Sequence, residues 1–324
     1  MMTLAQFWCG VIIIALLVYV VLDGFDLGVG MLIGMTRDEK HRTTMLKTIE
    51  PVWDGNETWL VVVGATLYAS FPTAYAIFMP AFYAGIVLML LALIFRGVGF
   101  EARNRSEQAR RRWDRAIIVG SVVAAFTQGA IVGALTGGID VENGQFAGAT
   151  LDSFTVFSVI AGIGCVVAYA LHGLAWLILK TEGPIRSWAY QRIPAFAAGW
   201  CAILTILFWR MLESHVNVIA KWSVISPRLI LPIIGLAAFA GLIYGVRRRI
   251  DSLPFAMTTT LFLVAGGMFV LTLQPYIVPW SITVAEAAAP QASLSFLLAG
   301  GVFALPAILI YTGVVYWVFR GKVQ

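Results

Sequence analysis

Apolar segments of about 20 residues recur along almost the whole chain, with only short polar stretches between them. A helix of this length spans the hydrocarbon core of a bilayer and satisfies its own backbone hydrogen bonds there. Hydrophobic residues make up 60% of the chain and charged residues 12%, which excludes an ordinary soluble domain. The sequence therefore predicts an all-α integral membrane protein with nine transmembrane helices. These helices are expected at about 5–33, 54–71, 74–95, 116–136, 154–179, 193–212, 229–246, 254–277 and 293–319.

The basic residues are distributed unevenly between the loops. Lys and Arg accumulate in cytoplasmic loops, and with nine helices and an outside N-terminus 19 of the 22 basic residues lie on the cytoplasmic side. The opposite side receives only Arg210, Lys221 and Arg228. The charge pattern thus predicts an N-terminus outside and a C-terminus in the cytoplasm. The N-terminal stretch MMTLAQFWCG lacks Lys and Arg, and the apolar run is too long for a signal peptide, so the first helix is expected to be retained.

The chain shows no clear internal repeat, and we expect one polytopic membrane domain over residues 1–324. Its first four helices, at about 5–136, and its later five, at about 154–319, suggest two four-helix bundles and one peripheral helix. The basic stretch RNRSEQARRRWDR, at 103–115, is typical of a cytoplasmic loop near anionic head groups. No nucleic-acid partner is expected.

Acidic residues interrupt the first two apolar segments, in VLDGFDLGVGML and WDGNETW. A charge at bilayer depth is costly, so such residues usually face the protein interior and mark a functional site. Asp23 and Asp26 are spaced i, i+3, as are Asp54 and Glu57, and residues with this spacing share one helix face. Small residues beside the first pair favour close helix packing: Gly24, Gly28 and Gly30. Both acidic faces are expected in the cytoplasmic half of the membrane, where they can meet each other or a partner.

The acids of the second segment are also compatible with helix capping. Asp54 could cap the second helix, with Asn56 and Glu57 contacting the amides of its first turn. Paired acids on glycine-interrupted helices also occur in ion-coupled secondary transporters, although no inverted repeat or second broken helix is found. A purely structural membrane scaffold would leave four acids on two helices unexplained. The acids by themselves therefore do not decide between an enzyme subunit, a transporter and a scaffold.

Ligands for a metal or a haem are scarce in the apolar segments. A haem iron needs an axial His, Met, Cys or Tyr, and only His172, in VAYALHGLAWLIL, is a histidine predicted inside the membrane. A lone helical histidine is more often a packing residue. His41 and His215 are expected in loops on opposite sides, and the three cysteines lack metal-binding spacing. We therefore expect no catalytic residue, no bound cofactor and no metal site in this chain.

Three motifs in order carry a family resemblance: DGFDLGVGML, WDGNETW and FRGVGFEAR. They resemble the signatures of the first three helices of subunit II of the cytochrome bd-type quinol oxidases. The resemblance implies a bacterial cytoplasmic-membrane complex that oxidises quinol and reduces O2 to water, contributing to the proton motive force. It implies that subunit I, the partner, holds two haems b and one haem d, while this chain is a haem-free scaffold in contact with lipid and quinone. It also allows for a small single-helix accessory subunit.

The resemblance further implies roles for individual residues. The acids of the proton path would be Asp23, Asp54, Glu57, Asp26 and Glu101. Trp59 would face lipid near the entrance of an oxygen route, and Trp53, the aromatic residue that precedes the helix 2 acid, would belong to the same route. Two positions depart from the family pattern, since Glu57 stands where many relatives carry Gln and Glu101 where Asp is expected.

Overall fold

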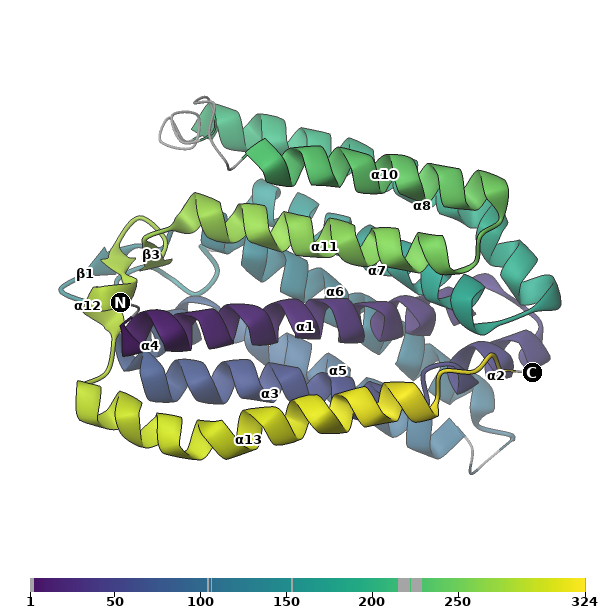
Figure 1. Cartoon of the computed structure of the whole chain (residues 1–324), viewed down its shortest axis with the longest axis horizontal. Coiled ribbons are helices and arrows are strands. Elements are labelled where there is room, and N and C mark those ends of the chain that lie inside the picture. Colours follow the sequence, from purple (N-terminus) through teal and green to yellow (C-terminus); the bar gives the residue numbers. More distant parts are fainter. Residues whose placement is uncertain are drawn as a thin grey trace.

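The structure, a computed structural model, describes residues 3–103, 105, 107–152, 154–214, 222 and 229–323. This part of the chain is almost entirely helical, as the sequence predicts, and its long helices pack side by side along a common direction (Figure 1). The outer-side residues His215, Lys221 and Arg228 lie outside the described residues.

The helices and strands occur in the following order. The long helices are α1 (Leu4–Leu32), α3 (Trp53–Ser70), α5 (Tyr83–Arg103), α6 (Arg110–Gly137), α7 (Val156–Lys180), α8 (Gly183–Ser214), α10 (Ile230–Arg248), α11 (Ser252–Leu273) and α13 (Gln291–Val318). The short helices are η1 (Ile33–Met35), α2 (Glu39–Lys47), α4 (Pro72–Ala81) and α12 (Val284–Ala287). Two antiparallel strand pairs are β1 (Val141–Glu142) with β2 (Gln145–Phe146), and β3 (Tyr276–Val278) with β4 (Ile282–Thr283). Both pairs lie at the same end of the molecule as the N-terminus (Figure 1).

Eight helices of the described chain are long and apolar enough to cross a membrane. They do not include α3, whose first turns carry Asp54, Asn56 and Glu57 and are therefore polar. Nevertheless α3 packs against α1 and α13, and the two termini lie at opposite ends of the helices (Figure 1), as an odd number of crossings requires. The membrane segment predicted at 54–71 is thus a helix, but its first turns are too polar for α3 to count among the candidate membrane spans.

The helices can be described as two groups joined through α7, while the division into two four-helix bundles stays a prediction. In the first group α3 packs on α1, α1 on α6, and α6 on α5; in the second, α8 and α11 pack on α7, and α10 packs on α11. Contacts of α7 with α1 and α6 join the groups. The last helix, α13, lies outside α3 and α1 and leaves most of its surface uncovered, so it is the peripheral helix.

One helix boundary differs from the prediction in a way that matters for the site. The segment expected at 74–95 is divided between α4 and α5 near Phe82, just after Pro80, whose ring interrupts helical hydrogen bonding. Helix α5 then continues to Arg103 instead of ending at residue 95. As a result Arg96, which the hydropathy pattern assigns to a loop, lies two turns inside a helix.

Glycines bring α1 and α7 into direct backbone contact, as the small residues of α1 predict. A Cβ on Gly28 would overlap the carbonyl oxygen of Tyr169, and a Cβ on Gly173 would lie 2.6 Å from the carbonyl carbon of Gly28. One turn away, a Cβ on Gly24 would lie 2.9 Å from the Tyr169 ring. The first acidic stripe therefore sits on a helix that is pressed against the second group.

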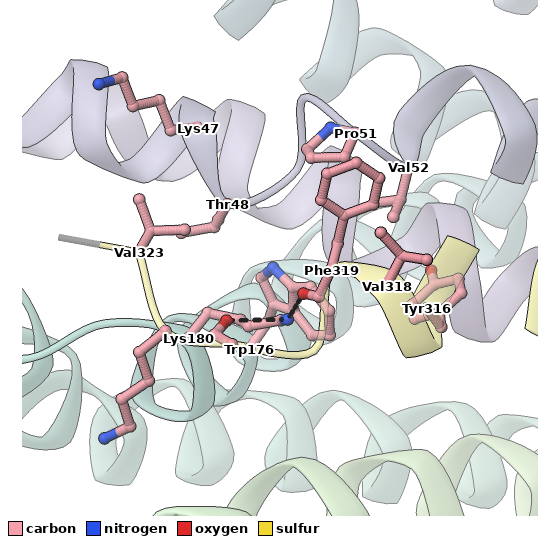
Figure 2. A pocket seen from close by; sticks show the side chains of 12 residues that line it. Lys47, Thr48, Pro51, Val52, Trp176, Lys180, Tyr316, Val318, Phe319 and Val323 are labelled. Carbon is pink, nitrogen blue, oxygen red and sulfur yellow. Dashed lines mark hydrogen bonds between the residues drawn. The ribbon is translucent and has the colours of Figure 1, made fainter. Parts of the chain in front are cut away.

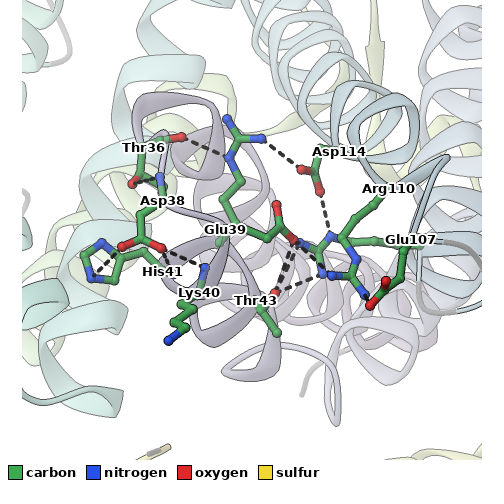
Figure 3. A network of polar contacts seen from close by, with 11 residues as sticks. Thr36, Asp38, Glu39, Lys40, His41, Thr43, Glu107, Arg110 and Asp114 are labelled. Carbon is green, nitrogen blue, oxygen red and sulfur yellow. Dashed lines mark hydrogen bonds and ion pairs between the residues drawn. The ribbon is translucent and has the colours of Figure 1, made fainter.

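An ion-pair network joins α2 to the α5–α6 turn (Figure 3). Arg103 contacts both Asp114, at 2.6 Å, and Glu39, at 2.6 Å, and Arg42 contacts the second oxygen of Asp114 at 3.0 Å. Arg103 and Asp114 are buried. Part of the basic stretch at 103–115 therefore has an internal structural role that its composition does not reveal.

Asp251, between α10 and α11, ties two further segments together at this end of the molecule. Its carboxylate accepts hydrogen bonds from Lys322 at 2.7 Å, Tyr190 at 2.9 Å and Arg186 at 3.1 Å. The C-terminal tail is thus fastened to the α10–α11 turn and to α8.

Acid is expected to destabilise this end of the molecule through Asp251. Burial raises the pKa of its carboxyl, but hydrogen bonds from Lys322 and Tyr190 and the charge of Arg186 outweigh burial and leave the pKa below its usual range. Such a group adds stability above its unfolded pKa of about 3.9, and this stability is lost as pH falls through the folded-state value. Thermal unfolding of the protein in detergent should show an acid-dependent loss that Asp251→Asn removes. A variant with unchanged acid dependence would contradict this assignment.

Candidate functional site

A buried arginine joins acidic residues from two other helices. Nη1 of Arg96, on α5, lies 2.9 Å from Oδ1 of Asp23, on α1, and 2.8 Å from Oε1 of Glu57, on α3. The side chains of Arg96 and Asp23 are 0% exposed, whereas that of Glu57 is 24% exposed. Buried charges require partners. Helix α5 supplies the positive charge, and α1 and α3 supply the negative charges that balance it. We call Asp23, Asp26, Asn56, Glu57 and Arg96 the acid–arginine cluster.

Aromatic rings cover the guanidinium group of Arg96. Its central carbon lies 5.9 Å from the ring centre of Trp53 and 5.8 Å from that of Phe100. These two rings are stacked on each other at 5.2 Å. A cation over aromatic faces is stabilised electrostatically, and the rings also screen the charge from lipid. Trp53 therefore contacts the cluster directly.

The second acid of α1 has its own set of contacts. Nδ2 of Asn56 donates to Oδ2 of Asp26 at 2.6 Å and to the carbonyl oxygen of Leu22 at 3.3 Å. The hydroxyl of Tyr316, on α13, donates to Oδ1 of Asn56 at 3.1 Å. Asn56 therefore binds α1 to α3, and the peripheral helix completes its hydrogen bonding.

Several polar atoms of the cluster have no hydrogen-bond partner among the described residues. They are Oδ2 of Asp23, Oδ1 of Asp26, and Nε and Nη2 of Arg96. Unsatisfied buried groups are costly and usually point to a functional need or to a ligand. The cluster can accept a proton at either of two carboxylate oxygens. Its guanidinium group stays charged and can donate further hydrogen bonds.

Two of the predicted acids lie outside the cluster. Asp54 is exposed on the first turn of α3, although it lies close enough to Glu57 to interact electrostatically. The capping interpretation of Asp54 is wrong, because the N-cap is Val52 and no side chain caps this helix. Asn56 and Glu57 bond to other helices instead of to first-turn amides. Glu101 is exposed on α5, away from the buried face that carries Arg96.

Trp59 does not face lipid, and that expectation is wrong. Its side chain is 3% exposed and packs with Ala15 and Tyr19. The spacing of Trp59 from Glu57 fixes its position on α3 but does not show that α1 covers this face.

Arg96 is the main functional residue that the sequence pattern does not reveal. The apolar window ends at residue 95, so the pattern places Arg96 among the loop arginines. The apolar residues Val98 and Phe100 after it are the available signal that the helix continues.

His172 is fully buried and both of its ring nitrogens are engaged. Nδ1 lies 2.8 Å from the hydroxyl of Thr258, and Nε2 lies 3.1 Å from the carbonyl oxygen of Val21. Its ring stacks on Phe255 at 4.8 Å. These contacts agree with the packing role expected for a lone helical histidine.

A cavity of about 250 Å³ lies where the C-terminal tail crosses the ends of the helices (Figure 2). Lys180 points into it and donates to the carbonyl oxygens of Phe319 and Gly321. The backbone N–H of Val323 donates in turn to the carbonyl oxygen of Lys180 at 2.8 Å. The ammonium group of Lys180 is thus hydrogen-bonded to backbone carbonyls of the C-terminal tail. These contacts hold the tail against the ends of the helices.

The fold and the site define a class of protein: a polytopic membrane protein with ionisable residues buried between its helices, an arrangement typical of proton and ion pathways. The particular family follows from sequence comparison. The chain belongs to the family of cytochrome bd terminal oxidase subunit II, whose model matches residues 4–319.

Individual relatives agree with this assignment. The chain is 26% identical to cytochrome bd ubiquinol oxidase subunit 2 of Bacillus subtilis, over 100% of this chain and 98% of the relative. It is also 26% identical to cytochrome bd-I ubiquinol oxidase subunit 2 of Escherichia coli K12, over 98% and 94% of the two chains. Among solved structures, bd oxidase from Geobacillus thermodenitrificans has a similar fold, with a TM-score of 0.79 and 16% identity over 98% of this chain and 99% of that chain.

Family membership settles the broad function. The chain is a multi-pass protein of the bacterial cytoplasmic membrane and a subunit of a terminal oxidase, an oxidoreductase complex that contains haem and in which it works with subunit I. The alternatives of a secondary transporter and of a scaffold outside any enzyme are thereby set aside.

Proposed function

We propose that this chain is the haem-free subunit of a quinol:O2 oxidoreductase and that its acid–arginine cluster belongs to a proton path serving oxygen reduction. Relatives named as ubiquinol oxidase subunits support the substrate. In this proposal subunit I holds two haems b and one haem d, quinol is oxidised, and O2 is reduced to water. The observation that carries the role of this chain is the buried contact of Arg96 with Asp23 and Glu57.

Three of the acids form a graded series of exposure. Asp54 is exposed, Glu57 is partly exposed and interacts with Asp54, and Asp23 is fully buried. A proton taken up at Asp54 would pass to Glu57 and then to Oδ2 of Asp23, since Oδ1 is bound to Arg96. The fixed charge of Arg96 keeps a carboxylate ready to accept the next proton. Asp26 extends the series along α1.

Orientation follows from the charge pattern. We place the N-terminus outside and the C-terminus in the cytoplasm, so that Asp54 and Glu101 lie toward the cytoplasm, the source of the protons.

A role of Trp53 and Trp59 in an oxygen route stays a prediction, as does a small accessory subunit. Lipid and quinone contact the exposed apolar surface in this proposal.

His172 is not free to ligate a haem iron, because both of its ring nitrogens are hydrogen-bonded. Among the described residues no group of three His, Cys, Asp or Glu side chains is suited to a metal. In this proposal the haems belong to subunit I, and this chain positions charges and protons.

Replacing Asp23 tests the proton path directly. Asp23→Asn keeps the shape of the side chain but removes the proton-accepting oxygen, and we expect oxygen uptake with quinol to fall at least about tenfold, equivalent to roughly 1.4 kcal/mol of barrier. Asp54→Asn should slow turnover less, because water can replace an exposed acid. Turnover should be measured on the purified complex, together with its haem spectrum.

A matched control separates transfer from assembly. Asp38→Asn changes an exposed carboxylate that caps α2, and Asn is an equally good cap, so this variant should keep full activity. Full turnover with normal haem content in the Asp23→Asn, Asp54→Asn double variant would refute the proton path.

A further inference from the structure

Two neighbouring carbonyl groups of α1, just before Asp23, accept side-chain hydrogen bonds from two other helices. Nε2 of His172, on α7, lies 3.1 Å from the carbonyl oxygen of Val21. Nδ2 of Asn56, on α3, donates to the carbonyl oxygen of Leu22 at 3.3 Å. A carbonyl group within an α-helix is already bonded to the N–H four residues on, and its second lone pair is free for such a contact. The backbone of α1 is therefore held from both α3 and α7 at the turn that carries Asp23.

The partners of His172 determine which ring nitrogen carries the hydrogen. A carbonyl oxygen only accepts, so Nε2 carries the hydrogen and donates it to Val21. In the neutral ring Nδ1 is then an acceptor, and the hydroxyl of Thr258, on α11, donates to it at 2.8 Å. That hydroxyl lies farther, at 3.0 Å and 3.1 Å, from the carbonyl oxygens of Pro254 and Phe255. Thr258 thus orients the ring, and the stacking of Phe255 on its face keeps it in place.

Hydrogen bonds at two successive carbonyls restrict the rotation of α1 about its own axis. Successive residues lie about 100° apart around the axis of an α-helix, so the donors from α3 and α7 reach α1 from different sides. Turning or sliding α1 would break one of these bonds. The close approach of Gly28 to the backbone of α7 sets the distance between the two helices. Such a contact has no preferred direction, whereas a hydrogen bond weakens steeply as its angle departs from linear.

The rotation of α1 decides where the side chain of Asp23 lies. Its Oδ1 is bonded to Nη1 of Arg96 at 2.9 Å, and the same Nη1 lies 2.8 Å from Oε1 of Glu57. A displacement of about 1 Å would lengthen the Asp23 contact beyond hydrogen-bonding distance. We propose that His172 is a positioning residue: its hydrogen bond to the α1 backbone fixes the rotation of this helix and holds Asp23 against Arg96. Its effect on turnover rests on the proposed role of Asp23 in the proton path.

Two amide substitutions separate the bonds of the two ring nitrogens. The amide of Gln reaches about as far as Nε2 and that of Asn only about as far as Nδ1. His172→Gln can therefore still donate to Val21, whereas His172→Asn is limited to Thr258. In oxygen uptake by the purified complex, His172→Gln should keep at least about half of the turnover, and His172→Asn should lose about fivefold, the equivalent of one hydrogen bond. The KM values for quinol and O2 should stay unchanged, because His172 is fully buried between helices of this chain.

His172→Phe distinguishes positioning from packing. This variant keeps a ring that can stack on Phe255 but has no donor for α1, so its turnover should fall as in His172→Asn. If the ring only fills space, His172→Phe should be fully active, and the two amides, which both lose the stacking, should behave alike. Either of these results in assembled complexes with normal haem content would overturn the proposal.

A double-mutant cycle on thermal unfolding tests the position of Asp23 without using turnover. Once His172→Phe has displaced Asp23, removing the charge of that acid should cost less. The losses of unfolding temperature from His172→Phe and Asp23→Asn should therefore not add. Arg42→Gln is the matched control: it removes an ion pair with Asp114, which keeps its contact with Arg103. Because this pair shares no partner with His172, the losses from Arg42→Gln and His172→Phe should add.

The double-mutant cycle also separates the positioning of Asp23 from the proton path. If Asp23→Asn is fully active, the proton path fails, while a non-additive cycle still supports the positioning. Additive losses for His172→Phe with Asp23→Asn, as for the control pair, would overturn the positioning whatever the turnover shows. If His172→Phe does not assemble, His172→Asn takes its place in the cycle, since it also lacks the donor for α1.

Discussion

Arg96→Met is expected to prevent assembly of a stable complex. The substitution keeps most of the apolar stem of the side chain but leaves Asp23 and Glu57 facing each other without a countercharge. Removing one partner of a buried ion pair typically costs about 3–5 kcal/mol, a large share of the stability of any protein. The yield of purified complex, its haem content and its thermal unfolding temperature measure the effect.

Two companion variants show whether charge is the cause. Arg96→Lys restores a positive charge but offers a compact ammonium group in place of the planar guanidinium, so it should assemble with reduced stability. The triple variant Asp23→Asn, Glu57→Gln, Arg96→Met removes all three charges and should recover assembly without recovering turnover. A stable Arg96→Met complex with the wild-type unfolding temperature would show that the acids do not need this partner.

Gly28→Ala is expected to give the second large loss of stability. The new methyl group would overlap the carbonyl oxygen of Tyr169. This oxygen belongs to the backbone of α7, so the clash cannot be relieved by a change of side-chain rotamer. Overpacking typically costs about 1–3 kcal/mol, and a collision with backbone places this variant at the upper end or beyond. Because α1 also carries Asp23 and Asp26, displacement of this helix from α7 should lower turnover together with stability.

The same helix provides the control for this glycine. A Cβ on Gly10 would meet nothing within 4 Å, and Ala is favoured over Gly in a helix by roughly 1 kcal/mol. Gly10→Ala should therefore keep or raise the unfolding temperature of the complex. Equal unfolding temperatures for Gly28→Ala and Gly10→Ala would contradict the close crossing of α1 and α7.

Periodicity predicts which residues share a helix face, and this is enough for part of the site. The spacing of Asp23 and Asp26 places both acids on one buried stripe of α1, and Glu57 on α3 does meet that stripe through Arg96. The long apolar windows likewise predict the membrane helices, because a helix must satisfy its own backbone in lipid.

Periodicity does not predict which neighbour covers a face, and this limits what the sequence reveals of the site. Asp54 shares a face with Glu57 but lies on the exposed first turn, while Trp59 is covered by α1. Arg96 escapes prediction because a hydropathy window ends at the first charge, although burial against two acids allows the helix to continue.

The contact between Tyr316 and Asn56 has a consequence for biosynthesis, since the two residues lie 260 positions apart in the chain. The ribosome releases α1, α3 and α5 first, so the acids and Arg96 can pair while most of the protein is still being translated. The hydroxyl that completes the bonding of Asn56 arrives only with the final helix. A nascent chain that stops before α13 presents an incompletely bonded amide beside Asp26 at the surface of its inserted helices. We therefore expect truncated products to be retained by the insertion machinery or degraded, and the last helix to decide when the subunit is released into the membrane.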